Sequence, residues 1–237
     1  MNNCLVCGNP KTVKSHLMPR SLMLDMKGDD TKIYEGERNA VGVKYRQNGY
    51  WDNSILCAEH EQESGWGDDY SVNFIRNFFS KASLSATGNS WEVQNPDPEK
   101  LVHFAYSVIW KHAVSKHGKK FNMTLGKYQE ILKKSIFNRH NFDQQLLIGD
   151  PNLTADELTI RNIALAPYRQ RLGGLNTWHF MLGGLEFFLN LDQRRFPKIW
   201  EPYLANANTN LIVSKSDAKN IGEVRLFDNI LTNMFGR

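Results

Sequence analysis

Cysteine is scarce in this sequence, with only three among 237 residues. Three cysteines cannot all pair, which excludes the complete disulfide framework that stabilises many small secreted domains. The N-terminus, Met1-Asn-Asn-Cys4, lacks the basic and apolar segments of a secretory signal peptide. No apolar run reaches the length of about 18 residues that a membrane-spanning helix needs. We therefore expect a soluble, cytoplasmic protein that has no membrane partner.

Long repeats and low-complexity tracts are also missing. With 41% hydrophobic residues, the chain has an ordinary globular composition and can bury a sizeable core. Its formal net charge of +4 and its pI near 8.9 make it mildly basic. A basic balance permits contact with phosphate groups, so nucleic acid, either DNA or RNA, is the expected partner. A protein partner or an oligomer is an open alternative.

The three cysteines lie in two short motifs, Cys4-Leu-Val-Cys7 and Cys57-Ala-Glu-His60. Each motif separates two soft ligands by two residues, so a tight turn can direct both at one ion. Tetrahedral zinc takes four such ligands from cysteine and histidine. We therefore expect one structural zinc ion bound by Cys4, Cys7, Cys57 and His60. The alternative is that the cysteines are free thiols or a redox pair, as a reducing cytoplasm would allow.

A second motif, Lys-Ser-His-Leu-Met-Pro-Arg, occupies residues 14–20 between the two cysteine motifs. At this point the chain resembles the zinc-ribbon branch of the HNH (ββα-metal) endonucleases. In that family, a C-x2-C pair precedes a strand ending in Asp-His-Ile-x-Pro, and a second C-x2-C pair opens a helix. The order of motifs is the same here. The resemblance places His16 on the general base and Pro19 on the proline that follows it.

The resemblance implies a nuclease that hydrolyses phosphodiester bonds with the help of a catalytic Mg²⁺ or Mn²⁺ ion. Ser15 stands where the family has a metal-binding aspartate, and Asp52 falls on its middle asparagine position. The acids that remain near the second motif include Glu61 and Asp68, which share one helix face by their spacing. We therefore name His16, Asp52, Glu61 and Asp68 as candidate catalytic residues.

A second interpretation of the same motifs is open. The chain is either an enzyme of this kind or a catalytically inactive, zinc-stabilised module that binds nucleic acid or protein. In the second case, His16 is an ordinary strand residue or a further zinc ligand.

More widely, the chain resembles an uncharacterised prokaryotic group of HNH-like proteins, through Ser-Val-Ile-Trp-Lys at 107–111 and the glycines at 183–184.

The rest of the chain predicts a mixture of helices and strands. Helices are expected from Ala58, with an interruption at 65–67, over 99–116 after an Asp97 N-cap, and over 125–138. Hairpins are expected over 32–45 and 177–191, and a strand over 210–214. The remaining histidines and the glycine pairs 173–174 and 183–184 are interpreted as structural, and the stretch 217–235 as a further strand or short helix.

Together these patterns predict an α+β protein. Residues 1–82 are expected to form a zinc-stabilised, ββα-metal-like region. Residues 83–237 are expected to form a mainly helical region with a small antiparallel sheet. The nearly all-apolar helix around Phe104 and Trp110 should lie at the centre of this second region, because it cannot stay exposed in a soluble protein.

Overall fold

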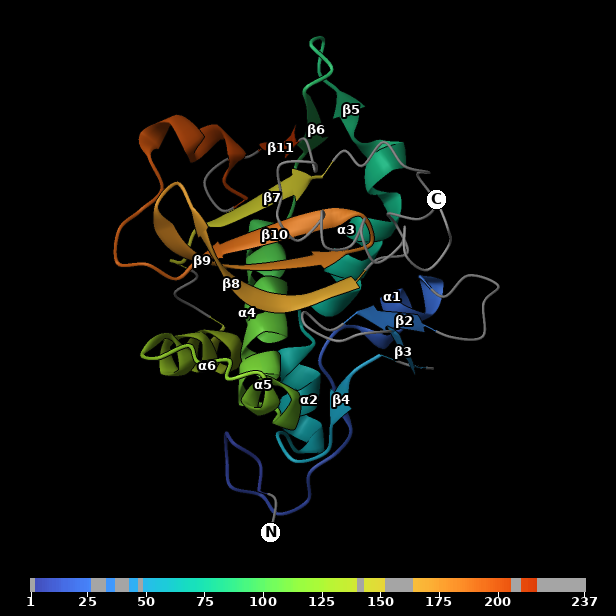
Figure 1. Cartoon of the computed structure of the whole chain (residues 1–237), viewed down its shortest axis with the longest axis vertical. Helices are drawn as coiled ribbons and strands as arrows, with labels where there is room; N and C mark the ends of the chain where they lie inside the picture. Colours follow the sequence, from blue (N-terminus) through green and yellow to red (C-terminus); the bar gives the residue numbers. More distant parts are fainter. Residues whose placement is uncertain are drawn as a thin grey trace.

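A long buried helix packed against one large sheet organises the fold (Figure 1). The computed structural model describes residues 3–26, 33–36, 43–46, 49–139, 143–151, 164–205 and 210–216. The helices are α1 (Arg20–Asp25), α2 (Ala58–Ser64), α3 (Asp68–Lys81), α4 (Pro98–Val114), α5 (Lys116–Lys120), α6 (Tyr128–Asn138) and the 3-10 helix η1 (Lys198–Tyr203).

Helix α4 forms where the sequence predicts it. The Asp97 carboxylate accepts a hydrogen bond of 3.1 Å from the backbone N–H of Lys100, and Pro98 occupies the first turn. Both features are typical of a helix start. Every residue of α4 from Leu101 to Val114 is buried, and Trp110 is only 1% exposed. The predicted central helix is therefore confirmed.

The sheet has seven strands in the order β5-β6-β11-β7-β10-β9-β8. Its members are β5 (Ser83–Leu84), β6 (Ser90–Gln94), β7 (Leu146–Asp150), β8 (Ala164–Leu172), β9 (Leu175–Leu182), β10 (Leu185–Asn190) and β11 (Asn210–Lys215). Strands β11 and β7 pair in parallel, whereas the other neighbours are antiparallel, so the sheet is mixed.

The hairpin of β9 and β10 is the part of the sheet that packs against Phe104 of α4. It turns through Gly183 and Gly184, which have φ values of 60° and 84°, a left-handed conformation that glycine adopts without a steric penalty. Phe180 and Phe187 face each other across the two strands and stack at 4.7 Å, and Phe104 of α4 packs edge-on against both rings. The predicted hairpin is thus confirmed.

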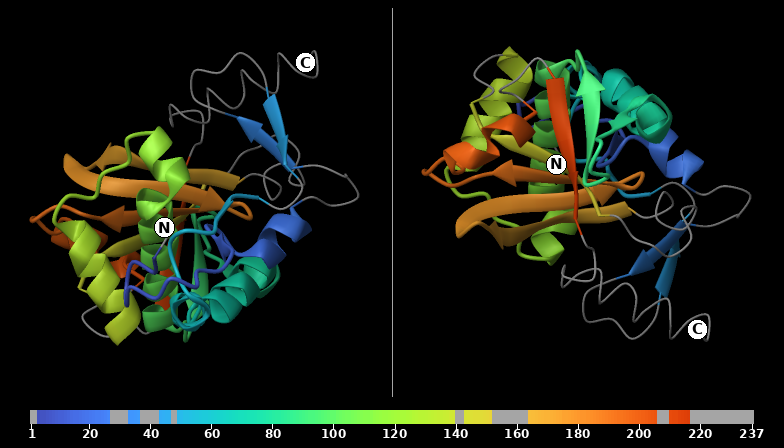
Figure 2. Two further views of the ribbon diagram at one scale, coloured as in Figure 1. Left: turned by 90° about the horizontal axis from the view of Figure 1, so that it is seen from below. Right: turned by 90° about the horizontal axis from the view of Figure 1, so that it is seen from above.

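The N-terminal part of the chain is built from short elements. They are β1 (Ser15–His16), β2 (Ile33–Gly36), β3 (Val43–Arg46) and β4 (Trp51–Asp52), with β1 paired to β4 and β2 to β3. The expected strand pair within 32–45 and the interruption of the helix after Ser64 are therefore confirmed. Side chains such as Leu17 and Leu56 join the same continuous core as α4 and the sheet. Figure 2 shows α1, in blue, lying beside α3, in teal.

The predicted fold class needs a correction. The chain is α+β overall, but its largest element is the seven-stranded mixed sheet rather than a small antiparallel one. The described N-terminal residues do not form the predicted ββα-metal fold, since β1 and β4 contain only two residues each. Much of the region expected to be mainly helical is sheet. The boundary at residues 82 and 83 stays a prediction, and the expected element at 217–235 lies outside the described residues.

Candidate metal centre and acid–base cluster

The two cysteine motifs meet at one point. Their four ligand atoms all lie within 4.8 Å of one another. The sulfur of Cys4 is 3.8 Å from Nδ1 of His60, the sulfurs of Cys7 and Cys57 are 3.9 Å apart, and Cys57 Sγ is 3.1 Å from His60 Nδ1. Zinc bonds of about 2.0–2.3 Å to a tetrahedron of ligands separate those ligands by roughly 3.3–3.8 Å. The cluster therefore fits a metal ion such as zinc, and the predicted ligand set comes together.

Local backbone contacts hold the ligands in place. The N–H of Gly8 donates to the carbonyl of Cys4 at 2.9 Å, and Gly8 has a φ of 77°, which closes the first turn. Leu5 N–H donates to the carbonyl of Ile55 at 2.8 Å, so the two motifs are tied together by their backbones. His60 follows in the first turn of α2, where Phe137 of α6 packs edge-on against its ring.

The thiol of Cys4 is prepared for metal binding. Burial alone would raise the pKa of Cys4, but backbone hydrogen bonds at Cys7, Cys57 and Val6 outweigh it, so the pKa lies below its ordinary value. A metal ion binds the thiolate rather than the thiol. The fold thus favours the ligand form of this side chain before any ion arrives.

A second group of polar side chains lies next to this centre. We call it the acid–base cluster and define it as His16, Glu61, Asp68 and Lys111. Lys111 is the unusual member, because it is a lysine in the last turn of the buried helix α4 and is only 3% exposed. Its Nζ lies 3.9 Å from Oε1 of Glu61. Lysine is almost never buried unless it is paired, so this charge has a structural partner in Glu61.

The members of the cluster act on one another electrostatically. Burial lowers the pKa of His16, and the nearby positive charges of Lys14, Lys111 and Arg20 lower it further against the opposing effect of Glu61. Burial raises the pKa of Asp68, as does the charge of Glu61, while Lys111 opposes the rise. Groups whose pKa values are perturbed by both burial and specific partners are typical of functional sites.

Several polar atoms of this region are buried without a hydrogen-bond partner among the described residues. They include Nδ1 of His16, Oε2 of Glu61 and Oγ of Ser15. An unpaired buried polar group costs about 1–3 kcal/mol, so folded proteins retain few of them. The retained ones are therefore candidates for contact with water, an ion or a substrate.

Asp52 does not join the acid–base cluster. Its Oδ1 accepts from the N–H of Ser54 at 2.8 Å and from the hydroxyl of Ser54 at 2.5 Å. Its Oδ2 accepts from the N–H of Lys116 at 2.7 Å, at the start of α5. Burial would raise the pKa of Asp52, but these hydrogen bonds outweigh it and lower the pKa. Both oxygens are thus in use: Oδ1 holds the turn after β4, and Oδ2 ties that turn to the junction of α4 and α5.

A buried polar chain in the sheet was not expected from the sequence, where His179 was interpreted only as structural. The Tyr168 hydroxyl contacts Nδ1 of His179, whose Nε2 lies 3.2 Å from Oε1 of Glu186. The side chains of His179 and Glu186 are each 1% exposed. These residues come from β8, β9 and β10, so their polar contacts form only once the three strands have paired.

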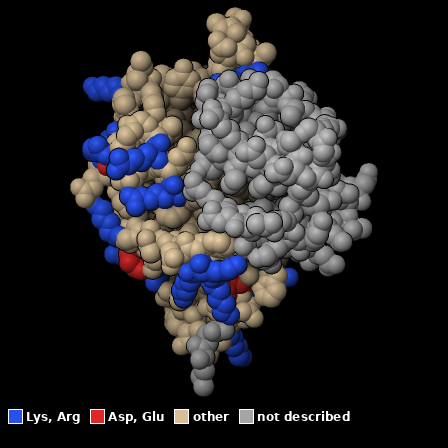
Figure 3. Space-filling model, in the orientation of Figure 1, with Lys and Arg blue, Asp and Glu red and all other residues tan. Residues whose placement is uncertain are grey.

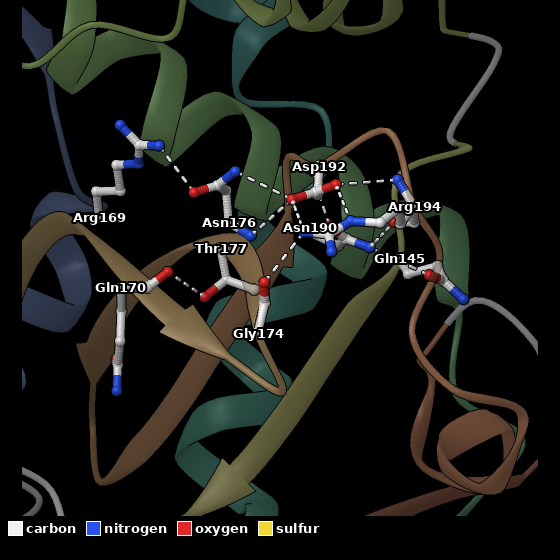
Figure 4. Close-up of polar contacts among 9 residues, drawn as sticks. All are labelled: Gln145, Arg169, Gln170, Gly174, Asn176, Thr177, Asn190, Asp192 and Arg194. Carbon is white, nitrogen blue, oxygen red and sulfur yellow. Dashed lines mark hydrogen bonds and ion pairs between the residues drawn. The ribbon is translucent and has the colours of Figure 1, made fainter.

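The end of the same sheet carries a network of fully used polar groups (Figure 4). Asp192 accepts from the backbone and guanidinium of Arg194 and from the backbone and side chain of Asn176. These hydrogen bonds hold the pKa of Asp192 well below its ordinary value. Arg194 also donates to the carbonyl of Gly174 at 3.0 Å. Because its groups are satisfied, this network is interpreted as structural.

Lys111 is the member of the acid–base cluster that the sequence did not identify as a site residue. Its only signal in the sequence is that it is the one lysine, arginine or acid in the stretch 101–114. Within the described part of the chain, the Cys3His set is the only group of three or more potential ligands placed closely enough for one ion. No described helix is long and apolar enough to cross a membrane.

Comparisons of this chain with models of protein families, with curated proteins and with solved structures find no match. Two neighbouring centres of the structure bear on its function. One is a set of soft ligands that suits a metal ion such as zinc. The other combines a half-buried histidine, two carboxyl groups and a buried ammonium group. A histidine base beside acids and a cation is an arrangement suited to proton transfer at an anionic substrate.

Proposed function

We propose that the protein is a zinc-stabilised nuclease that hydrolyses phosphodiester bonds of nucleic acid with His16 as the general base. The observation that carries the proposal is the pair of buried, partnerless atoms, His16 Nδ1 and Glu61 Oε2, beside the buried ammonium of Lys111. The resemblance of residues 4–70 to HNH endonucleases supports the same activity. The proposal rests on side-chain chemistry and does not require the ββα-metal fold.

His16 has the properties of a base at neutral pH. Its pKa lies below the ordinary value of about 6.5, so the imidazole is neutral at pH 7 and can accept a proton. In the reaction, the oxygen of water forms a bond to phosphorus while the bond to the leaving oxygen breaks. The proton of the water passes to His16, and the leaving oxygen takes a proton from solvent.

Lys111 supplies positive charge close to this base. Negative charge builds up on the phosphoryl oxygens during the reaction, and a preorganised cation in a site of low dielectric stabilises it strongly. Lys111 is buried, held 3.9 Å from Glu61, and acts on the pKa of His16. Lys111 lies in the last turn of α4, where the neighbouring residues of the helix are also buried, so its backbone is held firmly.

A hard cation such as Mg²⁺ or Mn²⁺ would be held in this cluster by no more than two carboxyl groups. Glu61 offers one oxygen without a hydrogen-bond partner. Asp68 is a second carboxyl group, and the charges of Glu61 and Lys111 both act on its pKa. Magnesium is often held by only one or two carboxylates, with water and substrate phosphate completing the shell. When bound, such an ion polarises a phosphoryl oxygen and activates water. Asp52 is not proposed as a ligand, since both its oxygens are in use.

The direct test is incubation of the purified protein with plasmid DNA and with structured and unstructured RNA. Reactions contain magnesium, manganese or no added divalent ion, and the zinc content is measured in parallel. Cleavage of any of these substrates, lost in His16→Ala protein that keeps its zinc and its thermal unfolding transition, supports the proposal. Absence of cleavage in all of them by folded, zinc-loaded protein refutes it.

A second candidate function is a non-catalytic, zinc-stabilised module that binds nucleic acid. It is favoured by a basic stretch on α5 and α6, beside the metal centre. Lys and Arg side chains outnumber Asp and Glu side chains on the described face in Figure 3, with one group over α5. Residues 116–139 contain seven basic residues and only one acidic residue, Glu130. The basic residues are Lys116, Lys119, Lys120, Lys127, Lys133, Lys134 and Arg139.

Charge reversal on this stretch is expected to weaken binding of nucleic acid. Lys119 and Lys120 are exposed at the end of α5, so Lys119→Glu with Lys120→Glu should preserve the fold. Each phosphate contact that is lost lowers the slope of log affinity against log salt by about 0.7–0.9. Titrations at several salt concentrations measure this slope. An unchanged slope would show that α5 does not contact the phosphates. The control is Lys198→Glu, which reverses the charge of an exposed lysine on η1.

A further inference from the structure

Trp51 is a large aromatic side chain that the fold leaves in solvent. It is 47% exposed, whereas Trp110 and Trp178 are buried in the core. A single exposed apolar side chain is common and needs no explanation by itself. Trp51 has, in addition, a basic neighbour: Nζ of Lys14 lies 4.6 Å from the centre of its ring.

The indole lies directly beside the proposed base. Strands β1 and β4 are antiparallel, with His16 opposite Trp51 and Ser15 opposite Asp52. Residues directly opposite each other project from the same face, with Cβ atoms about 4.5–5.5 Å apart. The burial agrees with this, because Ser15 and Asp52 are buried while His16 and Trp51 reach outward. Trp51 and His16 therefore occupy one face of the strand pair.

Exposed basic side chains also lie near this face. Residues 3–24 contain Lys11, Lys14 and Arg20 and no acidic residue. All three basic side chains are exposed. Lys14 and Arg20 both act on the pKa of His16, so their charges lie close to that side chain. An anionic ligand is thus favoured at the same edge where the aromatic ring is exposed.

We propose that Trp51 and Lys14 form a stacking platform for single-stranded nucleic acid. A nucleobase would stack on the indole, and Lys14 would neutralise a neighbouring phosphate. Single strands suit this arrangement because their bases expose aromatic faces, whereas the bases of a duplex are already stacked. Because Trp51 lies opposite His16 in the pairing of β4 with β1, the phosphodiester next to the stacked base would lie near His16. The positioning for cleavage rests on the proposed function, but the binding does not.

The test uses a fluorescently labelled oligothymidylate and measures binding by anisotropy without added magnesium or manganese. Stacking of a base on an aromatic side chain contributes about 1–3 kcal/mol, so Trp51→Ala should weaken binding by about 5- to 150-fold. Trp51→Phe should retain most of the affinity. Leu84→Ala is the matched control, because Leu84 is another exposed apolar residue at 51% and lies on β5. Thermal unfolding checks that each variant folds.

A strand of the same length with abasic sites separates stacking from charge. The wild-type protein should bind it more weakly than oligothymidylate, and Trp51→Ala should cause no further loss with it. The platform is refuted if Trp51→Ala binds oligothymidylate as the wild type does, or if the variant loses equal affinity for both strands. Preference of the wild type for duplex DNA over the single strand would refute it as well.

The outcomes for the platform and for the nuclease are distinct. Binding that depends on Trp51, without cleavage under any condition, removes the nuclease and supports the platform. Cleavage that depends on His16, with binding unaffected by Trp51→Ala, supports the nuclease and removes the platform. If both proposals hold, Trp51→Ala should reduce cleavage mainly at subsaturating substrate, through a higher KM, whereas loss of His16 should reduce kcat.

Discussion

Removal of the metal ion from the Cys3His centre is expected to unfold the N-terminal segment while leaving α4 and the sheet folded. The strands of this segment, β1 and β4, contain two residues each and provide little stability of their own. Structural zinc contributes an apparent binding free energy of about 10–16 kcal/mol to folding in small zinc domains. We therefore expect much of the order of residues 3–16 to depend on a metal ion bound at this centre.

Hydrogen exchange measures this effect residue by residue. The backbone N–H groups of Cys4, Val13 and Leu17 donate to Asn9, Leu56 and Tyr50, respectively, at 2.8–3.0 Å. A local loss of only about 4 kcal/mol would speed their exchange by about a thousandfold. Either a zinc chelator or the substitution Cys57→Ser should produce this change. Amides in the middle of α4 should keep their protection, since its packing against the sheet does not involve the metal.

Restoring zinc to the chelated wild-type protein should return the protection, whereas Cys57→Ser should not respond. Unchanged exchange after verified loss of the metal would contradict a structural role for the ion. Global unfolding of α4 together with the N-terminal segment would instead show one cooperative unit. That result would follow if the shared core, in which Leu17 and Leu56 join α4 and the sheet, transmits the loss.

The features that the sequence predicted correctly depend on contacts between near neighbours. The metal ligands follow from two local spacings, and α4 follows from the cap at Asp97 and its apolar turns. The sheet could not be predicted in the same way. Strand β7 pairs in parallel with β11, whose residues follow much later in the chain, and β8 is an edge strand with alternating polar residues. Such pairings are set by tertiary packing rather than by local pattern.

The same distinction applies to the candidate site. The order of motifs predicted that His16 and Glu61 lie near each other. The ion-pair partner of Glu61, however, is Lys111, which is fifty residues further along the chain on α4. Asp52 looks equally suitable in the sequence. In the structure, one of its oxygens accepts from Ser54, and the other accepts from the N–H of Lys116 because α5 packs beside β4. Which acid is available for chemistry therefore depends on long-range contacts that no spacing records.

Substitution of His16 by alanine is expected to lower the rate of phosphodiester cleavage by about 10²- to 10⁴-fold, the usual contribution of a general base. The pH dependence of kcat/KM tests the role more closely than the loss alone. A base must be unprotonated, so cleavage by the wild type should fall as the pH drops through the pKa of His16. Since burial and the charges of Lys14, Lys111 and Arg20 lower that pKa, the fall should begin below the ordinary value of about 6.5.

Removing one of these charges should move the pH profile in a known direction. Lys14 and Arg20 lower the pKa of His16, so Lys14→Ala and Arg20→Ala should each raise it and shift the acid limb to higher pH. A purely structural histidine would produce no such shift, even if its removal destabilised the protein. Arg20→Ala is the cleaner variant, because Lys14 also contacts Trp51 and its loss can weaken substrate binding. An acid limb that stays in place in both variants, or cleavage that survives His16→Ala, would assign the base to another group.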